Sequence, residues 1–242
     1  MNINIFPIKE EFESLLELYP PQLANKFLPE WYKKQDFAKY LDTRNTGKSI
    51  QARNCPAIQD IMTDGVIIPA WSDFYMYLNG DDIVWEVPVS KAFENYQWMG
   101  NQGADQIKDM PFKYHTNFGM LKINCPYYFQ APDGYGIEFS DPAYHLRRDI
   151  KILSGRVESD IWHETNFPFE FQVDLERLEG KKLMIKAGDP LIMLRLYKKD
   201  LRTNVSIEKY TEDFNLKQKK NSVIHNASSN EWIKYKRRKN ES

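Results

Sequence analysis

The sequence predicts a mainly β protein, built as an antiparallel β-sandwich, a jelly roll or a distorted barrel, with short N-terminal helices and a helical C-terminal extension. Aromatic residues make up 14% of the chain, and large flat side chains suit half-buried sheet surfaces. From residue 118 to residue 197, short apolar runs alternate with Pro and Gly, as in all-β folds. Alternating aromatic and aliphatic residues surround Asn79-Gly80, which is a strong hairpin signal.

The N-terminal elements follow from proline positions and apolar spacing. Residues 3–8 alternate and predict an edge strand, because Pro7 lacks the N–H that a central strand would need. Residues 10–19 have helical spacing at Phe12, Leu15 and Leu16, and Pro20-Pro21 ends that helix. A second short helix is expected from Pro29, which suits a first helical position.

The rest of the chain reads as one helix followed by strands. Residues 34–54 are irregular, whereas 55–65 predict a helix with Pro56 at its start and Gly65 at its end. Residues 90–111 fit either a helix or a long loop. Beyond them, Pro and Gly delimit expected strands at 118–130, 135–140, 148–157, 167–174, 181–186 and 190–197.

Length and charge predict one β-rich domain over residues 1–200, in which residues 1–54 form a helical or irregular lead-in. A chain of 242 residues can bury a core without disulfide staples. Residues 201–242 are expected to form a basic helical extension, because Lys and Arg outnumber Asp and Glu by six from Lys198 onward. The remainder is acidic, so the extension is expected to bind a partner or to dock on the body.

Cysteine usage and hydropathy predict a cytoplasmic protein without a membrane segment. Cys55 and Cys125 are too few for a disulfide scaffold or a Cys-rich zinc site, and two buried reduced thiols are expected. The N-terminus lacks a basic n-region and a long apolar run, so it does not read as a signal peptide. No window approaches the 18 apolar residues that a transmembrane helix needs.

Two phrases between Pro132 and Lys199, GRVESDI and GDPLIML, resemble the β-core of the trimeric dUTPase and dCTP deaminase superfamily. The resemblance implies that Glu158 activates a water molecule and that Asp160 supports it. Ile161 stands where the family has a base-stacking tyrosine, and the last 45 residues lack the glycines of the family's closing arm. The resemblance therefore favours the β-architecture over the activity.

A metal-dependent jelly-roll site is the alternative use of the same segment. Non-haem iron sites take two histidines and one carboxylate. Asp160 and His163 can converge across a turn, with His145 or His115 from a neighbouring strand. His163 and Glu164 are adjacent and would face opposite sides of a strand, so no complete metal site is predicted. Glu158, Asp160 and His163 are the predicted catalytic residues.

A second resemblance runs along the whole chain. Its residues are Cys55, Pro56, Asp60 and Gly65, then Pro132, Gly134 and Tyr135, and finally Gly188 and Pro190. This pattern is similar to a family of phage and bacterial proteins with no assigned function. The similarity implies one contiguous fold and a phage or bacterial origin, with the host cytoplasm as the location of a phage-encoded protein.

Aromatic residues supply the predicted binding surface. Either a ligand cavity or ordinary core packing explains their spacing of two along the hairpin. The predicted ligand-binding residues are Trp71, Tyr75, Tyr77, Trp85 and Tyr135. The tail sequence KYKRRK, with Trp232 and Tyr235 nearby, offers a nucleic-acid contact as an alternative to docking on an acidic neighbour.

The sequence thus favours a non-catalytic binding or assembly domain that forms homo-oligomers or binds a protein partner. No nucleophile, base and oxyanion or phosphate donors can be assembled into one site. The nucleophile-elbow, phosphate-loop and dinucleotide-binding motifs are absent, and the sequence leaves the cofactor unknown. The alternative is an enzyme acting on nucleotides or other small molecules, on a dUTPase-like or metal-dependent jelly-roll scaffold.

Overall fold

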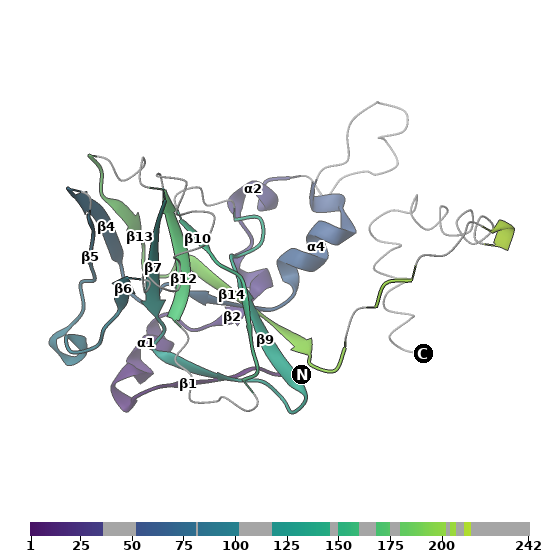
Figure 1. The fold of residues 1–242 in the computed structure, drawn as a ribbon, viewed down its shortest axis with the longest axis horizontal. Coiled ribbons are helices and arrows are strands. Elements are labelled where there is room, and N and C mark those ends of the chain that lie inside the picture. The colour runs from purple at the N-terminus through teal and green to yellow at the C-terminus, as the bar shows by residue number, and fades with distance from the viewer. Residues whose placement is uncertain are drawn as a thin grey trace. The chain divides into compact units, whose positions relative to one another are not determined.

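The computed structural model describes residues 1–35, 52–80, 82–101, 118–145, 150–159, 168–174, 180–201, 204–206 and 211–213. Within these ranges the strands form four antiparallel sheets and the helices are short, which confirms the mainly β prediction (Figure 1). The described strands do not close into a barrel. The chain divides into two units, Met1–Phe27 with Asp64–Leu201 and Leu28–Thr63 with Arg202–Ser242.

The largest sheet of the first unit has five strands in the order β11-β9-β14-β3-β2. Their bounds are β2 Gln22–Leu23, β3 Val66–Pro69, β9 Tyr135–Ser140, β11 Gly155–Val157 and β14 Pro190–Lys198. β14 lies between β3 and β9, and Ile192 and Leu194 on it are buried. The strands predicted at 135–140 and 190–197 are confirmed.

The three-stranded sheet contains the predicted hairpin. β4 (Phe74–Asn79) pairs with β5 (Asp82–Glu86) on one side and with β13 (Leu183–Ile185) on the other. Asn79 lies opposite Asp82, so the two-residue loop begins at Gly80, one residue later than the Asn-Gly pair suggests. Gly80 has φ +63°, a backbone conformation that hairpin loops require and that glycine adopts readily.

The other two sheets divide predicted strands between them. Four strands follow the order β10-β12-β7-β6, and β1 pairs with β8 alone. The bounds are β1 Asn4–Pro7, β6 Met99–Asn101, β7 Phe118–Asn124, β8 Tyr127–Gln130, β10 Ile150–Ile152 and β12 Pro168–Asp174. The expected strand 118–130 breaks at Cys125-Pro126, and 148–157 breaks between β10 and β11. Each break moves the chain into another sheet.

Short helices accompany the sheets. The first unit has η1 (Glu10–Phe12), α1 (Glu13–Leu18), η2 (Ala24–Phe27) and η5 (Lys91–Phe93). The second has α2 (Glu30–Lys33), η4 (Ala52–Asn54) and α4 (Pro56–Thr63), and there the Arg53 guanidinium donates to the backbone oxygens of Lys33 and Gln35. The helices predicted near Phe12, from Pro29 and from Pro56 are confirmed. The predicted C-terminal helical extension lies almost wholly outside the described residues.

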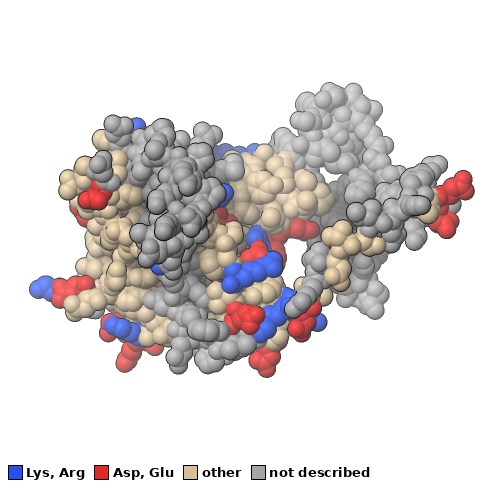
Figure 2. All heavy atoms as spheres, in the orientation of Figure 1, with Lys and Arg blue, Asp and Glu red and all other residues tan. Residues whose placement is uncertain are grey.

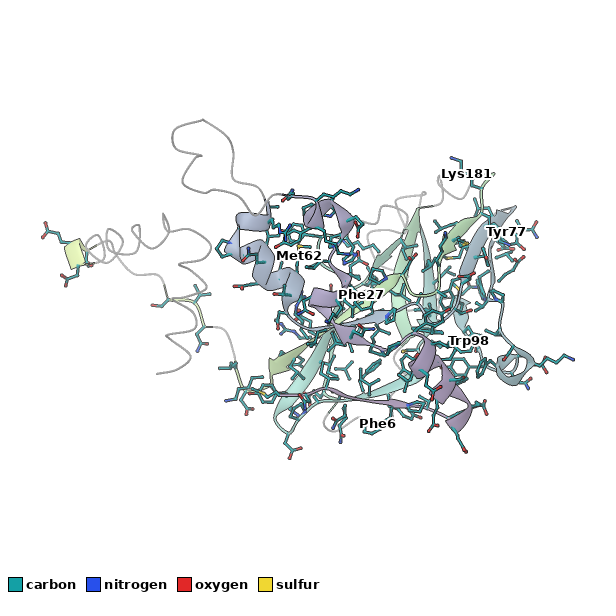
Figure 3. The ribbon with its side chains drawn as sticks, turned by 180° about the vertical axis from the view of Figure 1, so that it is seen from behind. Phe6, Phe27, Met62, Tyr77, Trp98 and Lys181 are labelled. Carbon is teal, nitrogen blue, oxygen red and sulfur yellow. The ribbon has the colours of Figure 1, made fainter. Side chains whose placement is uncertain are left out.

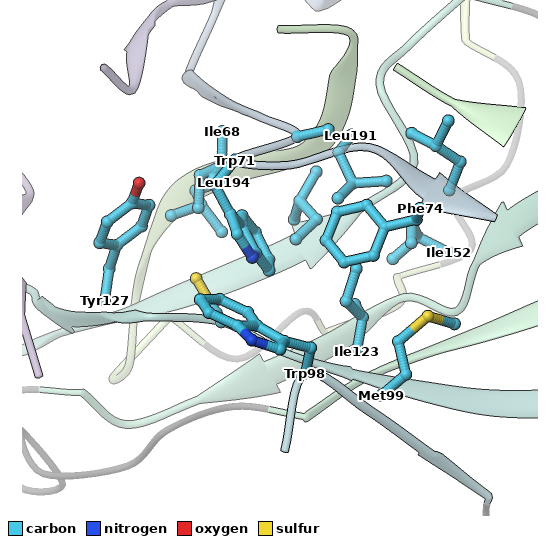
Figure 4. Close-up of a cluster of buried hydrophobic side chains, with 14 of the residues drawn as sticks. Ile68, Trp71, Phe74, Trp98, Met99, Ile123, Tyr127, Ile152, Leu191 and Leu194 are labelled. Atoms are coloured by element: carbon cyan, nitrogen blue, oxygen red, sulfur yellow. The ribbon is translucent and has the colours of Figure 1, made fainter. Parts of the chain in front are cut away.

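One apolar core connects all four sheets of the first unit (Figure 4). Ile68 and Leu194 come from the five-stranded sheet, Phe74 from the hairpin sheet, Ile123 from the four-stranded sheet and Tyr127 from the two-stranded sheet. All five side chains are buried. In Figure 4, Trp71 and Trp98 lie inside this cluster. Both residues also line the hollow of the candidate site.

Candidate functional site

The first unit contains a partly open hollow of about 290 Å³. Its lining comes from α1, the connection after β3, the segment between β5 and β6, and the turn before β14. The lining residues are Leu15, Leu18, Tyr19, Trp71, Ser72, Asp73, Pro88, Val89, Ser90, Phe93, Trp98 and Ala187.

Backbone hydrogen bonds fix the wall that carries Trp71. The Ala70 N–H donates to the Asp189 carbonyl over 2.8 Å, and the Gly188 N–H donates to the Ala70 carbonyl over 2.7 Å. Gly188 has φ +87°, a left-handed conformation that suits glycine. The two bonds join the β3–β4 connection to the turn before β14. Trp71, only 1% exposed, is the most deeply buried residue of the lining.

Aromatic rings form the inner part of the hollow. The Trp98 indole N–H donates to the Phe93 carbonyl over 3.2 Å, and the two rings meet edge to face with centroids 6.2 Å apart. Tyr96 also packs against Trp98, with ring centroids 4.6 Å apart, and the centre of the Trp71 ring lies 6.4 Å from that of Trp98. The Trp71 indole N–H has no hydrogen-bond partner among the described residues. The aromatic residues of the lining therefore pack against one another, and the Trp71 indole N–H is enclosed within the protein.

The polar groups of the lining are held in place. The Asp73 carboxylate accepts the Ala187 N–H over 2.8 Å at Oδ1 and the Tyr75 hydroxyl over 3.3 Å at Oδ2. The Ser72 hydroxyl donates to the Pro88 carbonyl over 3.3 Å. Asp73 is the only charged residue of the lining. The hollow thus combines aromatic walls with one fixed negative charge.

The hairpin divides the predicted ligand-binding residues between two faces of the sheet. Tyr75 and Tyr77 lie on the outer face, and Figure 3 shows Tyr77 on the outer side and Trp98 farther inside. Trp85 lies opposite the buried Met76 and packs against the core. Tyr135 begins β9 and is partly buried against the same core. Of the predicted set, Trp71 alone lines the hollow. Tyr75 does not line it but donates a hydrogen bond to Asp73, which does.

The outer face of the hairpin carries a closed polar cluster. The Lys182 ammonium pairs with Glu86 and lies 4.5 Å from the centre of the Tyr75 ring, and the Tyr77 hydroxyl donates to Glu86 over 3.1 Å. The hydrogen bond and charge of Lys182 lower the pKa of Glu86, and Tyr77 lowers it further. The bond to Glu86 raises the pKa of Lys182 and of Tyr77. These groups satisfy one another's charges and hydrogen bonds. They link β4 and β5 to Lys182, the residue just before β13.

Of the predicted catalytic residues, only Glu158 is described. It follows β11, is exposed, and lies 3.4 Å from the Lys199 Nζ. Asp160 and His163 lie outside the described residues. The neighbouring Ser159 is fully buried, and its hydroxyl oxygen accepts the Ala131 N–H over 3.2 Å. Within the described part of the chain, no cluster of three or more His, Cys, Asp or Glu side chains suits a metal ion.

Charged pairs lie on the exposed surface of the five-stranded sheet, at its edge formed by β11 and β9. Arg156 pairs with Glu138 over 2.8 Å, and its guanidinium lies 4.8 Å from the centre of the Tyr197 ring. Figure 2 shows blue and red side chains next to one another on this face of the molecule. The pairing of opposite charges indicates a solvated sheet surface, where each exposed pair contributes about 0–1 kcal/mol.

Sequence reasoning missed most of the hollow. Asp73 comes from the expected start of a strand, and Phe93 and Trp98 come from residues 90–111, which fit either a helix or a long loop. Their local signals were weak, although Trp98 follows a Gly- and Pro-free aromatic run that includes Phe93 and Tyr96. A residue contributes to this hollow through long-range packing, which spacing along the chain does not report.

A scan against protein-family models and a search of curated proteins found no match to this chain. Within its described residues, none of the helices combines the length and the apolar composition that crossing a bilayer requires.

Proposed function

We propose that the chain is a non-catalytic binding protein whose β-rich unit holds a small ligand in the hollow beside Trp71. The observation that carries this proposal is a hollow lined mainly by aromatic and apolar side chains, with one carboxylate held in place by two hydrogen bonds. The volume of about 290 Å³ is close to the lower end of small-molecule sites.

The lining supports binding because contacts within the protein hold its side chains in place. Packing fixes the rings of Trp71, Phe93 and Trp98, and hydrogen bonds fix Ser72 and Asp73. A site that needs no ordering when the ligand arrives loses less conformational entropy on binding. Rigid aromatic walls with few polar groups are typical of small-molecule sites.

The composition of the lining favours binding over catalysis. It contains no His, Cys or Lys, and both oxygens of its one carboxylate already accept hydrogen bonds. A general base must reach the proton that it removes, and a nucleophile needs a base beside it. Neither arrangement exists among the twelve lining residues. Glu158, the described member of the predicted catalytic set, lies outside the lining and pairs with Lys199.

Filling the hollow tests the proposal. Ser90 lines it, is exposed, and makes no side-chain cap at η5, so Ser90→Leu inserts an apolar group without removing a bond. The matched control is Ser154→Leu, at an exposed serine outside the hollow. We expect at least one compound from a panel of small neutral, cationic and anionic molecules to raise the Tm and to change the tryptophan fluorescence of the unmodified chain.

The same response should be lost in Ser90→Leu and kept in Ser154→Leu, because a ligand stabilises the folded state only where it binds. If both variants respond alike, the ligand binds elsewhere and the proposal is wrong. A panel without any response contradicts it as well.

A further inference from the structure

We infer that Asn79 is a site of spontaneous chemical modification, at which the side-chain amide converts to a carboxylate that weakens the hairpin. The juxtaposition that carries this inference is an exposed asparagine at the end of β4, followed by Gly80 and lying directly opposite Asp82 of β5. β4 and β5 lie side by side in Figure 1. Asn79 is not part of the lining of the hollow, so this modification does not depend on the proposed function.

The chemistry needs only the chain and water. The backbone nitrogen of Gly80 attacks the side-chain carbonyl carbon (Cγ) of Asn79, which closes a five-membered succinimide ring. The new C–N bond replaces the bond to the side-chain nitrogen, and that nitrogen leaves as ammonia with the proton of the Gly80 amide. Water then opens the ring. Breaking the ring bond to Cγ gives aspartate, and breaking the ring bond to the backbone carbonyl carbon gives isoaspartate.

The surroundings of Asn79 and Gly80 leave this reaction open. Both residues are exposed. No described residue hydrogen-bonds to the Asn79 side chain or accepts the Gly80 N–H, so no such bond holds the two reacting groups apart. Nothing lies within 4 Å of a Cβ built on Gly80, so described protein atoms do not crowd the attacking residue. Glycine also lets the backbone rotate into the ring geometry, because it has no Cβ of its own.

Asn79-Gly80 is the single Asn-Gly pair of the sequence, and Asn4 offers a matched comparison. Asn4 is also exposed and lies on β1, but its Nδ2 donates to the Gln130 Oε1 over 3.4 Å. The residue after it is Ile5, whose branched Cβ crowds the approach to the backbone nitrogen. Asn4 should therefore convert much more slowly than Asn79.

The product affects the hairpin through its cross-strand partner. Residues directly opposite in an antiparallel pair have Cβ atoms about 4.5–5.5 Å apart, and like charges there are destabilising. A carboxylate at position 79 faces the Asp82 carboxylate, whereas the neutral amide of Asn79 does not repel it. Isoaspartate also adds a methylene group to the backbone, which disrupts the two-residue loop that holds position 79 opposite Asp82.

Peptide mapping by mass spectrometry tests the site. The full chain is incubated in warm, mildly alkaline buffer, and the conversion of Asn79 and Asn4 is followed over time in the same sample. We expect Asn79 to convert at least about tenfold faster than Asn4, with both aspartate and isoaspartate as products. Asn79→Gln should stay unmodified over the same period, because its extra methylene requires a less favourable six-membered ring.

Asn79→Asp reproduces the aspartate product and tests its effect. We expect it to raise the amide-exchange rates of β5 about twofold to fivefold, the range that corresponds to like charges on facing strands. Asp82→Asn in the same chain should abolish this increase, since the repulsion needs both carboxylates. Asn4→Asp, opposite the uncharged Gln130, is the matched control and should leave exchange in β1 and β8 unchanged.

Neither readout depends on ligand binding, so the ligand panel decides the proposed function separately. Conversion of Asn79 no faster than that of Asn4 would overturn the modification site. Equal increases in exchange from Asn79→Asp with and without Asp82→Asn would overturn the effect on the hairpin, and so would the absence of any increase.

Discussion

Two polar atoms in the core of the β-rich unit, the Trp71 indole nitrogen and the Tyr127 hydroxyl, have no hydrogen-bond partner among the described residues. They belong to rings that meet edge to face with centroids 6.1 Å apart. Burial raises the pKa of Tyr127, and the nearby Cys125 thiol raises it further, so the phenol stays neutral throughout the ordinary pH range. Trp71 also lines the hollow, but its indole N–H is enclosed within the protein, so both polar atoms are unsatisfied inside the core.

Removing the Tyr127 hydroxyl should not destabilise the protein. Tyr127→Phe deletes a buried oxygen that makes no bond, so we expect the free energy of unfolding to stay unchanged or to rise by about 1 kcal/mol. Tyr96→Phe is the matched control, because its hydroxyl donates to the Cys125 carbonyl over 3.0 Å and its loss should cost about 1 kcal/mol. Urea unfolding measures both. Equal losses would show that Tyr127 has a partner.

A comparison of Gly65 with Gly134 separates the cost of backbone strain from the cost of steric crowding. Both have positive φ, +100° and +75°, so alanine at either position should cost about 1–2 kcal/mol. A Cβ on Gly65 would also lie 2.4 Å from the Leu194 carbonyl oxygen, whereas nothing lies within 4 Å of one on Gly134. We expect Gly65→Ala to cost about 1–3 kcal/mol more than Gly134→Ala in urea unfolding. Equal costs would mean that β14 shifts to make room for the added Cβ at position 65 without losing stability.

At the scale of elements, the sequence predicted strands well where turn residues bound a short alternating or apolar run. Residues 135–140 alternate, residues 190–197 form a nearly continuous apolar run, and β9 and β14 match them closely. The breaks inside 118–130 and 148–157 carry local signals, Pro126 in the first and Ser154-Gly155 in the second, although the expected strands continue through both. What ends β7 is a change of sheet at Cys125-Pro126, and a change of sheet depends on partners distant in sequence.

The cluster on the outer face of the hairpin should depend on pH. The lowered pKa of Glu86 means that its contribution to stability is present above the ordinary glutamate range and is lost as the pH falls through the lowered value. Lys182→Met should raise the midpoint of the Glu86 carboxyl titration, followed by ¹³C NMR, because it removes the main cause of the shift. Lys181→Met, at the adjacent exposed lysine, should leave that midpoint unchanged. An unmoved midpoint in Lys182→Met would contradict the pairing.

At the scale of the whole molecule, the shared core predicts that the four sheets of the β-rich unit lose protection together. Leu194 on β14 is 1% exposed, and Leu194→Ala should cost about 2–5 kcal/mol. Amide exchange should then accelerate alike in β4, β7, β8 and β14, one strand from each sheet, because their buried side chains belong to one cluster. Protection lost in β14 alone would show that the sheets unfold separately.

The candidate site marks the limit of prediction from sequence. Trp71 was named as a ligand-binding residue because of its aromatic neighbours, yet the other walls of the hollow come from α1, Phe93, Trp98 and Ala187. These segments meet only through tertiary packing, and no local pattern reports that. Glu158, Asp160 and His163 remain a prediction, and so does the dUTPase-like resemblance on which the roles of Glu158 and Asp160 depend.

The hydrogen bond from the Ala24 N–H to the Gly65 carbonyl, together with the pairing of β2 with β3, has a consequence for how this chain can evolve. The chain leaves the β-rich unit after residue 27 and re-enters it at residue 64, and the backbone is already joined just beside both points. The entropy of closing a loop grows only slowly with its length. Insertions, deletions or wholesale replacement between residues 28 and 63 would therefore leave the threading of the β-core intact, and related chains should differ most in length at this position.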